Sequence, residues 1–256
     1  METKKIEVII KDLTQVFFEA GDLSIELRNK GLTKNIKKDN TPVTNGDIEV
    51  NNIILNNLKK ISPSIPIVSE ETSENKNLDL NTFWLVDPID GTYDYINNRD
   101  EFTLNAGLII NKVAVAGIIY APAKKRMFYS YGNNISYELN NSNEKVLNNK
   151  NIDKNNIRAV SYSNNLKPEI IEIHKKLKVK EYVKMKSSLK FCVIAAGEFD
   201  LYVAEPRACE WDIAAGHAIL KNAGGIITDF EGNEILYGKK DFINPSIVLK
   251  RSHNLK

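Results

Sequence analysis

Apolar residues recur at intervals of three and four over residues 4–28, the spacing of one face of an α-helix. We therefore predict an amphipathic helix there, ended by Gly31. The sequence TPVTNGD at residues 41–47 is typical of a turn, and a second stretch with helical spacing follows it over residues 48–58. Each predicted helix would bury one apolar face against a core.

Short apolar runs, typical of strands, follow these helices. The run at residues 65–71 ends on two glutamates, and after a polar loop the run at residues 83–87 ends on an aspartate. Two longer runs meet at the turn Asn111-Lys112, and aromatic residues alternate with polar ones over residues 127–139. This part of the chain therefore reads as rich in β-structure.

The asparagine-rich stretch at residues 140–156 shows neither periodicity, and we interpret it as a loop that divides the chain. Helical and strand-like patterns alternate after it. Strands are predicted at 157–163, 199–205 and from 226, and helices at 168–178, 188–197 and 211–225. We predict an α+β portion over residues 1–145 and an α/β portion over residues 146–256, in layers, with the active site in the cleft between them.

The composition of the chain argues against several classes of protein. The net charge is only +2, with 27% charged residues, which gives no reason to expect a nucleic-acid polymer as ligand. No run approaches the ~18 apolar residues of a membrane span, and the N-terminus lacks the features of a signal peptide. The two cysteines form no CxxC motif, so we expect reduced thiols in a cytoplasmic protein.

Acidic residues stand where predicted strands end or helices begin. They are Asp47, Glu70, Glu71, Asp87, Asp90 and Asp212. Such positions gather functional groups in α/β proteins, and Mg²⁺ binds through a few carboxylates plus water and substrate phosphate. Pro88 fixes one backbone angle, so the turn can aim both aspartates at one point, with the carbonyl of Ile89 as a further oxygen.

A helix that begins after Gly91-Thr92 would point free N–H groups at the same place and could hold a phosphate. Carboxylates around Mg²⁺ next to such a helix start indicate a phosphate-ester hydrolase. Each feature taken alone has a structural reading: the Asp-Pro sequence as a plain turn, Asp212 as a helix cap, and Asp47 as a first-turn helix residue.

The combination of SEE (69–71), DPIDGT (87–92), WDIAAG (211–216) and AGG (223–225) resembles the inositol monophosphatase superfamily of Mg²⁺-dependent, lithium-sensitive phosphatases. The resemblance runs over essentially the whole chain and implies the layered αβαβα sandwich of these sugar phosphatases. Within the superfamily, TPVTNGD, SSLKFC (187–192), Leu201-Tyr202 and FINP (242–245) look most like the 3′(2′),5′-bisphosphate nucleotidases, which convert adenosine 3′,5′-bisphosphate to AMP.

The resemblance also implies roles for individual residues. Glu70, Asp87 and the Ile89 carbonyl would hold a first Mg²⁺, and Asp87, Asp90 and Asp212 a second, with two or three ions per site. The implied catalytic set is Asp47, Glu70 and Thr92, in which Asp47 and Thr92 activate the attacking water. The implied substrate-binding set is Glu70, Ile89, Asp90, Gly91, Thr92, Ser187, Lys190 and Asp212, in which Ser187 and Lys190 hold the nucleotide and its second phosphate. A surface position for Lys190 is the alternative reading.

The chain departs from the nucleotidase pattern at a few positions. Lys186 stands where many relatives have a small residue, and Val203-Ala204 stands where an arginine is usual; Arg207 could replace that arginine if the loop bends. An inositol or sugar monophosphatase is therefore an alternative, as is an idle metal-binding regulator. The partner is expected to be a small phosphorylated substrate, with the chain a monomer or homodimer and the basic run at residues 175–180 a solvated face or a weak contact with the inner membrane.

Overall fold

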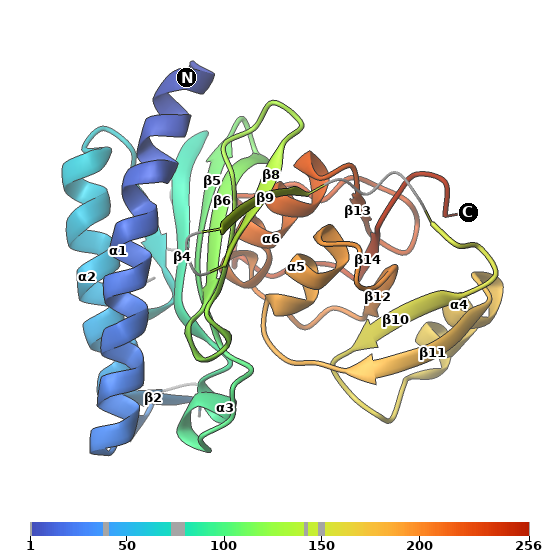
Figure 1. The fold of residues 1–256 in the computed structure, drawn as a ribbon, viewed down its shortest axis with the longest axis horizontal. Helices are drawn as coiled ribbons and strands as arrows, with labels where there is room; N and C mark the ends of the chain where they lie inside the picture. The colour runs from blue at the N-terminus through green and yellow to red at the C-terminus, as the bar shows by residue number, and fades with distance from the viewer. Residues whose placement is uncertain (1, 38–40, 73–79, 141–142, 148–151, 256) are drawn as a thin grey trace.

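Helices and sheets alternate in layers across the molecule, in the order αβαβα predicted from the sequence (Figure 1). The computed structural model describes residues 2–37, 41–72, 80–140, 143–147 and 152–255. The predicted loop at 72–81 lies largely outside the described residues.

The first layer consists of two antiparallel helices on one side of the larger sheet (Figure 1). Helix α1 (Thr3–Lys30) confirms the first predicted helix, and Gly31 ends it with φ of 101°, a backbone angle that favours glycine. Helix α2 (Asn45–Ile61) confirms the second. The predicted turn at 41–47 is only partly right, because it contains strand β2 (Pro42–Thr44), which pairs with β1 (Lys34–Ile36).

The second layer is a seven-stranded sheet in the order β3-β4-β5-β6-β7-β8-β9. Its strands are β3 (Ile67–Ser69), β4 (Thr82–Asp90), β5 (Thr103–Ile110), β6 (Val113–Ala121), β7 (Arg126–Ser130), β8 (Ser136–Asn140) and β9 (Asn143–Leu147). The interpretation of residues 140–156 as a featureless loop is wrong at β9, which pairs with β8 at the sheet edge. Its side chains are exposed up to Leu147, so no apolar alternation marked it.

The middle layer holds helices α5 (Leu189–Ala195) and α6 (Glu210–Asn222), which lie between the two sheets. Helix α6 lies directly on β5 and β6. A Cβ added at Gly107 would lie 2.7 Å from Ala214 Cβ, and one added at Gly117 would lie 2.7 Å from Ala215 Cα. These two glycines therefore set the close approach of α6, and with it the place of its N-terminus.

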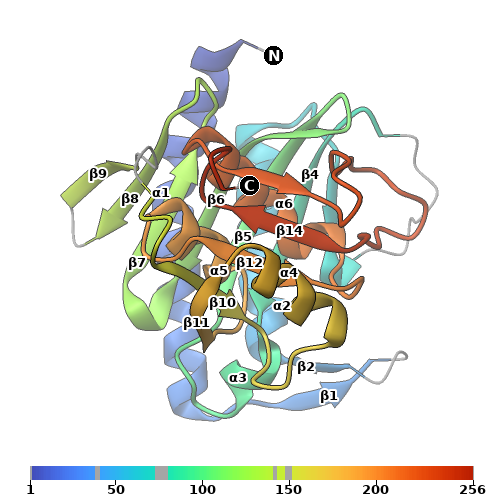
Figure 2. The same ribbon diagram turned by 90° about the vertical axis from the view of Figure 1, so that its right-hand side faces the viewer.

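The fourth layer is a five-stranded sheet in the order β11-β10-β12-β14-β13, covered by α4 (Pro168–Lys176) (Figure 2). Its strands are β10 (Ile157–Ser161), β11 (Val179–Lys184), β12 (Leu201–Ala204), β13 (Ile226–Thr228) and β14 (Ile247–Lys250). The lysines of the basic run at 175–180 are all exposed, which fits the predicted solvated face, and β11 begins within the run. The division of the chain at residue 145 stays a prediction.

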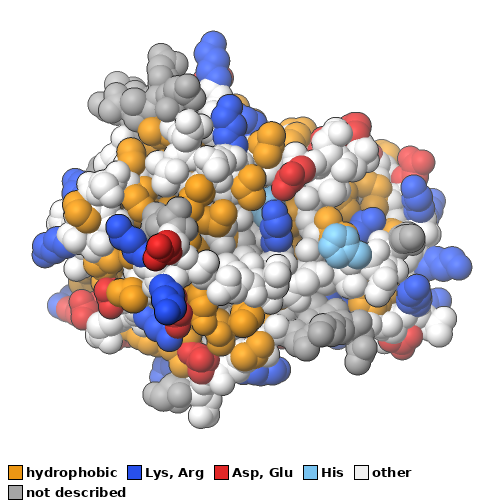
Figure 3. Space-filling view, turned by 90° about the horizontal axis from the view of Figure 1, so that it is seen from above, with side chains coloured by type: hydrophobic (Ala, Val, Ile, Leu, Met, Phe, Trp, Pro, Cys, Tyr) orange, Lys and Arg blue, Asp and Glu red, His pale blue; other side chains and the backbone are white. Residues whose placement is uncertain are grey.

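The surface matches the small net charge of +2. On the face in Figure 3, basic and acidic side chains are interspersed among apolar ones, and neither sign covers a continuous area. Among the described residues, no helix is both long and apolar enough to cross a bilayer.

Candidate functional site

Two pockets lie side by side where the larger sheet, α3 (Thr92–Ile96), α5 and α6 meet. We call the first the acidic pocket; it has a volume of about 640 Å³, and Glu70, Asp87, Asp90 and Asp212 are among its lining residues. We call the second the basic pocket; it has a volume of about 300 Å³, and Lys186, Lys190 and Arg207 are among its lining residues. Asp90, Gly91, Tyr93 and Asp212 line both pockets, so the two form one continuous site.

The acidic pocket brings together side chains that lie far apart in the sequence. Glu70 begins the 3₁₀ turn η1 (Glu70–Thr72) directly after β3, and Asp212 stands in the first turn of α6. Asp87 and Asp90 lie at the end of β4, as predicted, and the register of β4 against β5 shifts between them. This irregularity bends the strand and lets both aspartates line one pocket.

Asp87 is the most deeply buried of these carboxylates, with 1% of its surface exposed. Neither of its oxygens has a hydrogen-bond partner among the described residues. Burial, followed by the charges of neighbouring carboxylates including Glu70 and Asp90, raises the pKa of Asp87 well above its usual value. Burial likewise raises the pKa of Asp212 to about 8, with Asp90 and Glu70 adding to the shift. The buried oxygens of Asp87, which lack donors among the described residues and lie near other carboxylates, fit a hard divalent cation, which would satisfy and neutralise them.

The carboxylates of the described residues nevertheless do not form a complete set of metal ligands in this structure. No group of three or more His, Cys, Asp or Glu side chains in the described parts of the chain is positioned to hold a metal ion as it stands. Lys37 reaches over from the end of β1, and its Nζ lies 2.8 Å from Glu70 Oε1 and 2.8 Å from Glu71 Oε1. The predicted metal ligands thus share a pocket, and an ammonium group compensates part of their charge. The sequence did not single out Lys37.

Asp47 uses its two carboxylate oxygens for two different contacts. Oδ2 accepts from the backbone N–H of Thr44 at 2.8 Å and from Thr44 Oγ1 at 2.6 Å. The first of these bonds, together with the bond from the backbone N–H of Asp47 to Thr44 Oγ1, makes the capping box of α2. Oδ1 accepts from Thr92 Oγ1 at 3.0 Å. Burial raises the pKa of Asp47, against the lowering effect of the Thr44 hydrogen bonds. The helix-cap reading and the contact with Thr92 are therefore compatible.

The predicted helix after Gly91 is confirmed as α3, with only five residues. Gly91 has φ of 97°, and a Cβ there would lie 2.9 Å from the carbonyl oxygen of Glu101. Only glycine fits this conformation and this space, so the residue serves the turn itself. Thr92 begins α3, and its Oγ1 also lies 3.1 Å from the carbonyl of Ile89.

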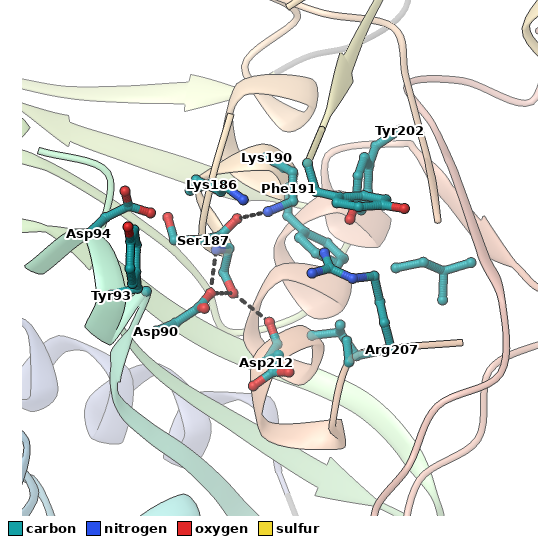
Figure 4. A pocket seen from close by; sticks show the side chains of 16 residues that line it. Asp90, Tyr93, Asp94, Lys186, Ser187, Lys190, Phe191, Tyr202, Arg207 and Asp212 are labelled. Carbon is teal, nitrogen blue, oxygen red and sulfur yellow. Dashed lines mark hydrogen bonds between the residues drawn. The ribbon is translucent and has the colours of Figure 1, made fainter. Parts of the chain in front are cut away.

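Figure 4 shows the basic pocket, in which three basic side chains converge. Lys186 comes from the segment before α5, Lys190 from α5 and Arg207 from the loop after β12. Lys190 is 7% exposed, so its reading as a surface lysine is wrong. Its Nζ donates to the carbonyl of Ser187 and lies 5.3 Å from the centroid of the Tyr202 ring. Burial lowers the pKa of Lys190 to about 8.

The loop after β12 bends so that Arg207 lines the basic pocket. Its guanidinium carbon lies 3.9 Å from the centroid of the Tyr162 ring. Val203 and Ala204 are fully buried in β12 and offer no charge. Arg207 therefore stands in a position to supply the guanidinium that the sequence lacks at 203 and 204.

Ser188 is a residue whose contacts sequence reasoning missed. It lies between the predicted residues Ser187 and Lys190, and its hydroxyl contacts Asp90 and the backbone of Asp212. Only the motif SSLKFC pointed to this segment, and it did not distinguish the second serine from the first.

Known proteins with the same sequence features share this architecture. The profile of the inositol monophosphatase family matches residues 5–255. The chain is 36% identical over 244 residues to the 3′(2′),5′-bisphosphate nucleotidase CysQ of Buchnera aphidicola, covering 92% of this chain and 91% of that protein. It is 31% identical over 254 residues to CysQ of Escherichia coli, covering 93% of this chain and 97% of that protein.

Solved structures of other proteins have the same fold as this chain. CysQ from Bacteroides thetaiotaomicron, described as a bacterial member of the inositol monophosphatase family, superposes with a TM-score of 0.77 and 28% identity, covering 92% of this chain and 94% of that one. An inositol monophosphatase from Thermotoga maritima, at 23% identity and a TM-score of 0.76, shares the fold. The family resemblance and the layered sandwich predicted from the sequence are thus confirmed, and the chain belongs to the inositol monophosphatase family.

Proposed function

We propose that the chain is a Mg²⁺-dependent 3′(2′),5′-bisphosphate nucleotidase that removes the 3′-phosphate of adenosine 3′,5′-bisphosphate and releases AMP. The observation that carries this proposal is the shared wall of the two pockets, formed by Asp90, Gly91 and Asp212 among others. A substrate with two phosphates could place one beside the carboxylates and the other beside Lys190 and Arg207. The names of the CysQ relatives support the same choice of substrate.

Glu70, Asp87, Asp90, Asp212 and the Ile89 carbonyl would hold two or three Mg²⁺ ions. When bound, Mg²⁺ supplies positive charge that polarises the phosphate and acidifies a water molecule. The Lys37 ammonium, whose Nζ lies 2.8 Å from Glu70 Oε1, would compete with Mg²⁺ for this carboxylate.

The chain's own residues would handle the proton of the attacking water. When Thr92 Oγ1 donates to Asp47 Oδ1, its lone pairs remain available to accept from that water. The water proton then moves toward Thr92 and Asp47 as the new P–O bond forms. The bond between phosphorus and the ribose oxygen breaks, and that oxygen takes up a proton to become the product hydroxyl. Gly91 and Thr92 would hold the scissile phosphate through their backbone N–H groups.

The basic pocket would bind the second phosphate. Arg207 can donate two parallel hydrogen bonds to a phosphate, while Lys190 meets it as a point charge. Ser187, whose carbonyl holds the Lys190 ammonium, would fix the lysine in place. We also expect the enzyme to act in the cytoplasm, as a monomer or homodimer.

The test is release of inorganic phosphate from adenosine 3′,5′-bisphosphate in Mg²⁺, with and without EDTA. We expect release that EDTA abolishes, and a higher kcat/KM than with inositol 1-phosphate. Preference for inositol 1-phosphate would favour the monophosphatase reading, for which the absence of charge at Val203-Ala204 is the supporting observation. No release from either substrate would leave the idle metal-binding regulator.

A further inference from the structure

Ser188 lines the basic pocket and contacts Asp90 and Asp212, the two aspartates that line both pockets. It is 2% exposed and directly precedes α5. Its backbone N–H donates to Asp90 Oδ2, and its Oγ lies 2.6 Å from the same oxygen, across 98 residues of sequence. The same Oγ contacts the carbonyl oxygen of Asp212 in α6. One serine thus contacts an aspartate from the larger sheet and the backbone of another from α6.

A second buried side chain, that of Asn105, contacts this hydroxyl. It lies on β5 directly opposite Asp87, is fully buried, and donates from Nδ2 to Ser188 Oγ across 3.2 Å. A hydroxyl has one proton to give and two lone pairs to accept with. Because Asn105 fills a lone pair, the proton of Ser188 is left to point at Asp90 Oδ2 or at the Asp212 carbonyl.

The two oxygens of the Asp90 carboxylate differ in their hydrogen bonds. The hydrogen bonds that described residues donate to Asp90 both reach Oδ2. We propose that Ser188, oriented by Asn105, is a positioning residue that holds Asp90 through Oδ2 and reserves Oδ1 for the cation of the acidic pocket. The inference rests on the proposed function, because it requires that the pocket bind a divalent cation. Partners behind a metal ligand commonly change metal affinity about 10- to 100-fold when they are removed.

The test measures Mg²⁺ binding without substrate, by calorimetric titration of the full chain. Ser188→Ala removes the hydroxyl, and Ser188→Cys keeps nearly the same shape with a weak donor. We expect both variants to weaken Mg²⁺ binding about 10-fold or more. Ser136→Ala is the matched control, because Ser136 is also fully buried and donates from Oγ to the Ile219 carbonyl of the same helix α6, but lines neither pocket.

The possible outcomes distinguish a failure of this inference from a failure of the proposed function. If wild type binds Mg²⁺ and both Ser188 variants bind it with unchanged affinity, Ser188 does not position Asp90. The same conclusion follows if Ser136→Ala weakens binding as much as Ser188→Ala, since the effect would then be one of general stability. If wild type itself binds no Mg²⁺ and releases no phosphate, the proposed function fails as well.

Discussion

Thr92 donates from Oγ1 to Asp47 Oδ1 across 3.0 Å, although 45 residues separate them in the chain. The contact joins the start of α3 to the first turn of α2, beside the pocket that gathers the buried carboxylates. Because Asp47 Oδ2 is already used by Thr44, the Oδ1 contact is not needed to cap the helix. It is therefore available for a role in catalysis.

This contact predicts different effects for two substitutions of the same residue. Thr92→Val keeps the shape of the side chain and removes the hydroxyl, so we expect kcat to fall about 100-fold or more, the size of a lost general-base pathway. Thr92→Ser keeps the hydroxyl and should retain kcat within a few-fold. Initial rates of phosphate release at saturating Mg²⁺ measure both. A Thr92→Val enzyme with the wild-type kcat would remove Thr92 from the proton path.

Arg207 predicts a change in substrate preference. Arg207→Gln removes the guanidinium from the basic pocket, so KM for adenosine 3′,5′-bisphosphate should rise about 10-fold or more, as for a lost hydrogen bond to a charged group. KM for inositol 1-phosphate should change little, since that substrate carries no second phosphate. Arg158→Gln is the control, because Arg158 pairs with Glu181 on the exposed sheet edge. Equal increases for both substrates would exclude Arg207 from recognition of the second phosphate.

The sequence predicted those elements whose own residues carry a strong pattern. Helices α1 and α2 have apolar residues at helical spacing, and β4, β5 and β6 are long buried runs. Strands β9 and β11 were missed because they lie at sheet edges with mostly exposed side chains. Their pairing is decided by a neighbouring strand, and a single sequence does not display that neighbour.

The candidate site divides in the same way. The acidic residues stand at recognisable positions in short motifs, and the structure places Glu70, Asp87, Asp90 and Asp212 in one pocket. Lys37 and Ser188 were not singled out, since their contacts in the site are with residues far along the chain. Lys37 meets Glu70 from 33 residues away, and Ser188 meets Asp90 from 98 residues away. Such roles follow from tertiary contacts and leave no local signature.

We predict that the substitution Asp87→Asn stabilises the metal-free protein and weakens the binding of Mg²⁺. Asp87→Asn replaces a buried carboxylate that has no hydrogen-bond partner among the described residues by a neutral amide of the same shape. The metal-free variant should therefore unfold at a higher temperature than wild type. Mg²⁺ at about 100 times its Kd should stabilise wild type by about 2.7 kcal/mol and the variant far less.

Thermal unfolding with and without Mg²⁺ measures both effects. Asp200→Asn is the control of opposite sign, because buried Asp200 accepts from the backbone N–H of Arg158 at 2.8 Å and pairs with Arg251 at 2.9 Å. That substitution should destabilise the protein and leave the Mg²⁺ effect intact. An Asp87→Asn protein with the full Mg²⁺ effect would contradict the assignment of Asp87 to the metal.

His217 predicts how stability depends on pH. It is 2% exposed in α6, and its Nδ1 lies 2.9 Å from the hydroxyl of Tyr237. Burial, followed by the charges of Lys221 and Lys239, lowers its pKa from 6.5 to about 3. The unfolded chain therefore binds a proton below about pH 6.5 while the folded chain does not, so this residue costs stability as the pH falls from 6.5 toward 3.

For one proton, the free energy of unfolding changes by about 1.4 kcal/mol per pH unit. Between pH 6.5 and 5.0, His217 therefore lowers the free energy of unfolding by about 2 kcal/mol. Denaturant unfolding of wild type and His217→Asn at pH 7 and pH 5 measures it. The buried carboxylates are common to both proteins, so their effects cancel in the difference. We expect the stability advantage of wild type over His217→Asn to shrink by about 2 kcal/mol at pH 5. An advantage that stays constant would mean that His217 takes up its proton in the folded protein, and that α6 opens enough to hydrate it.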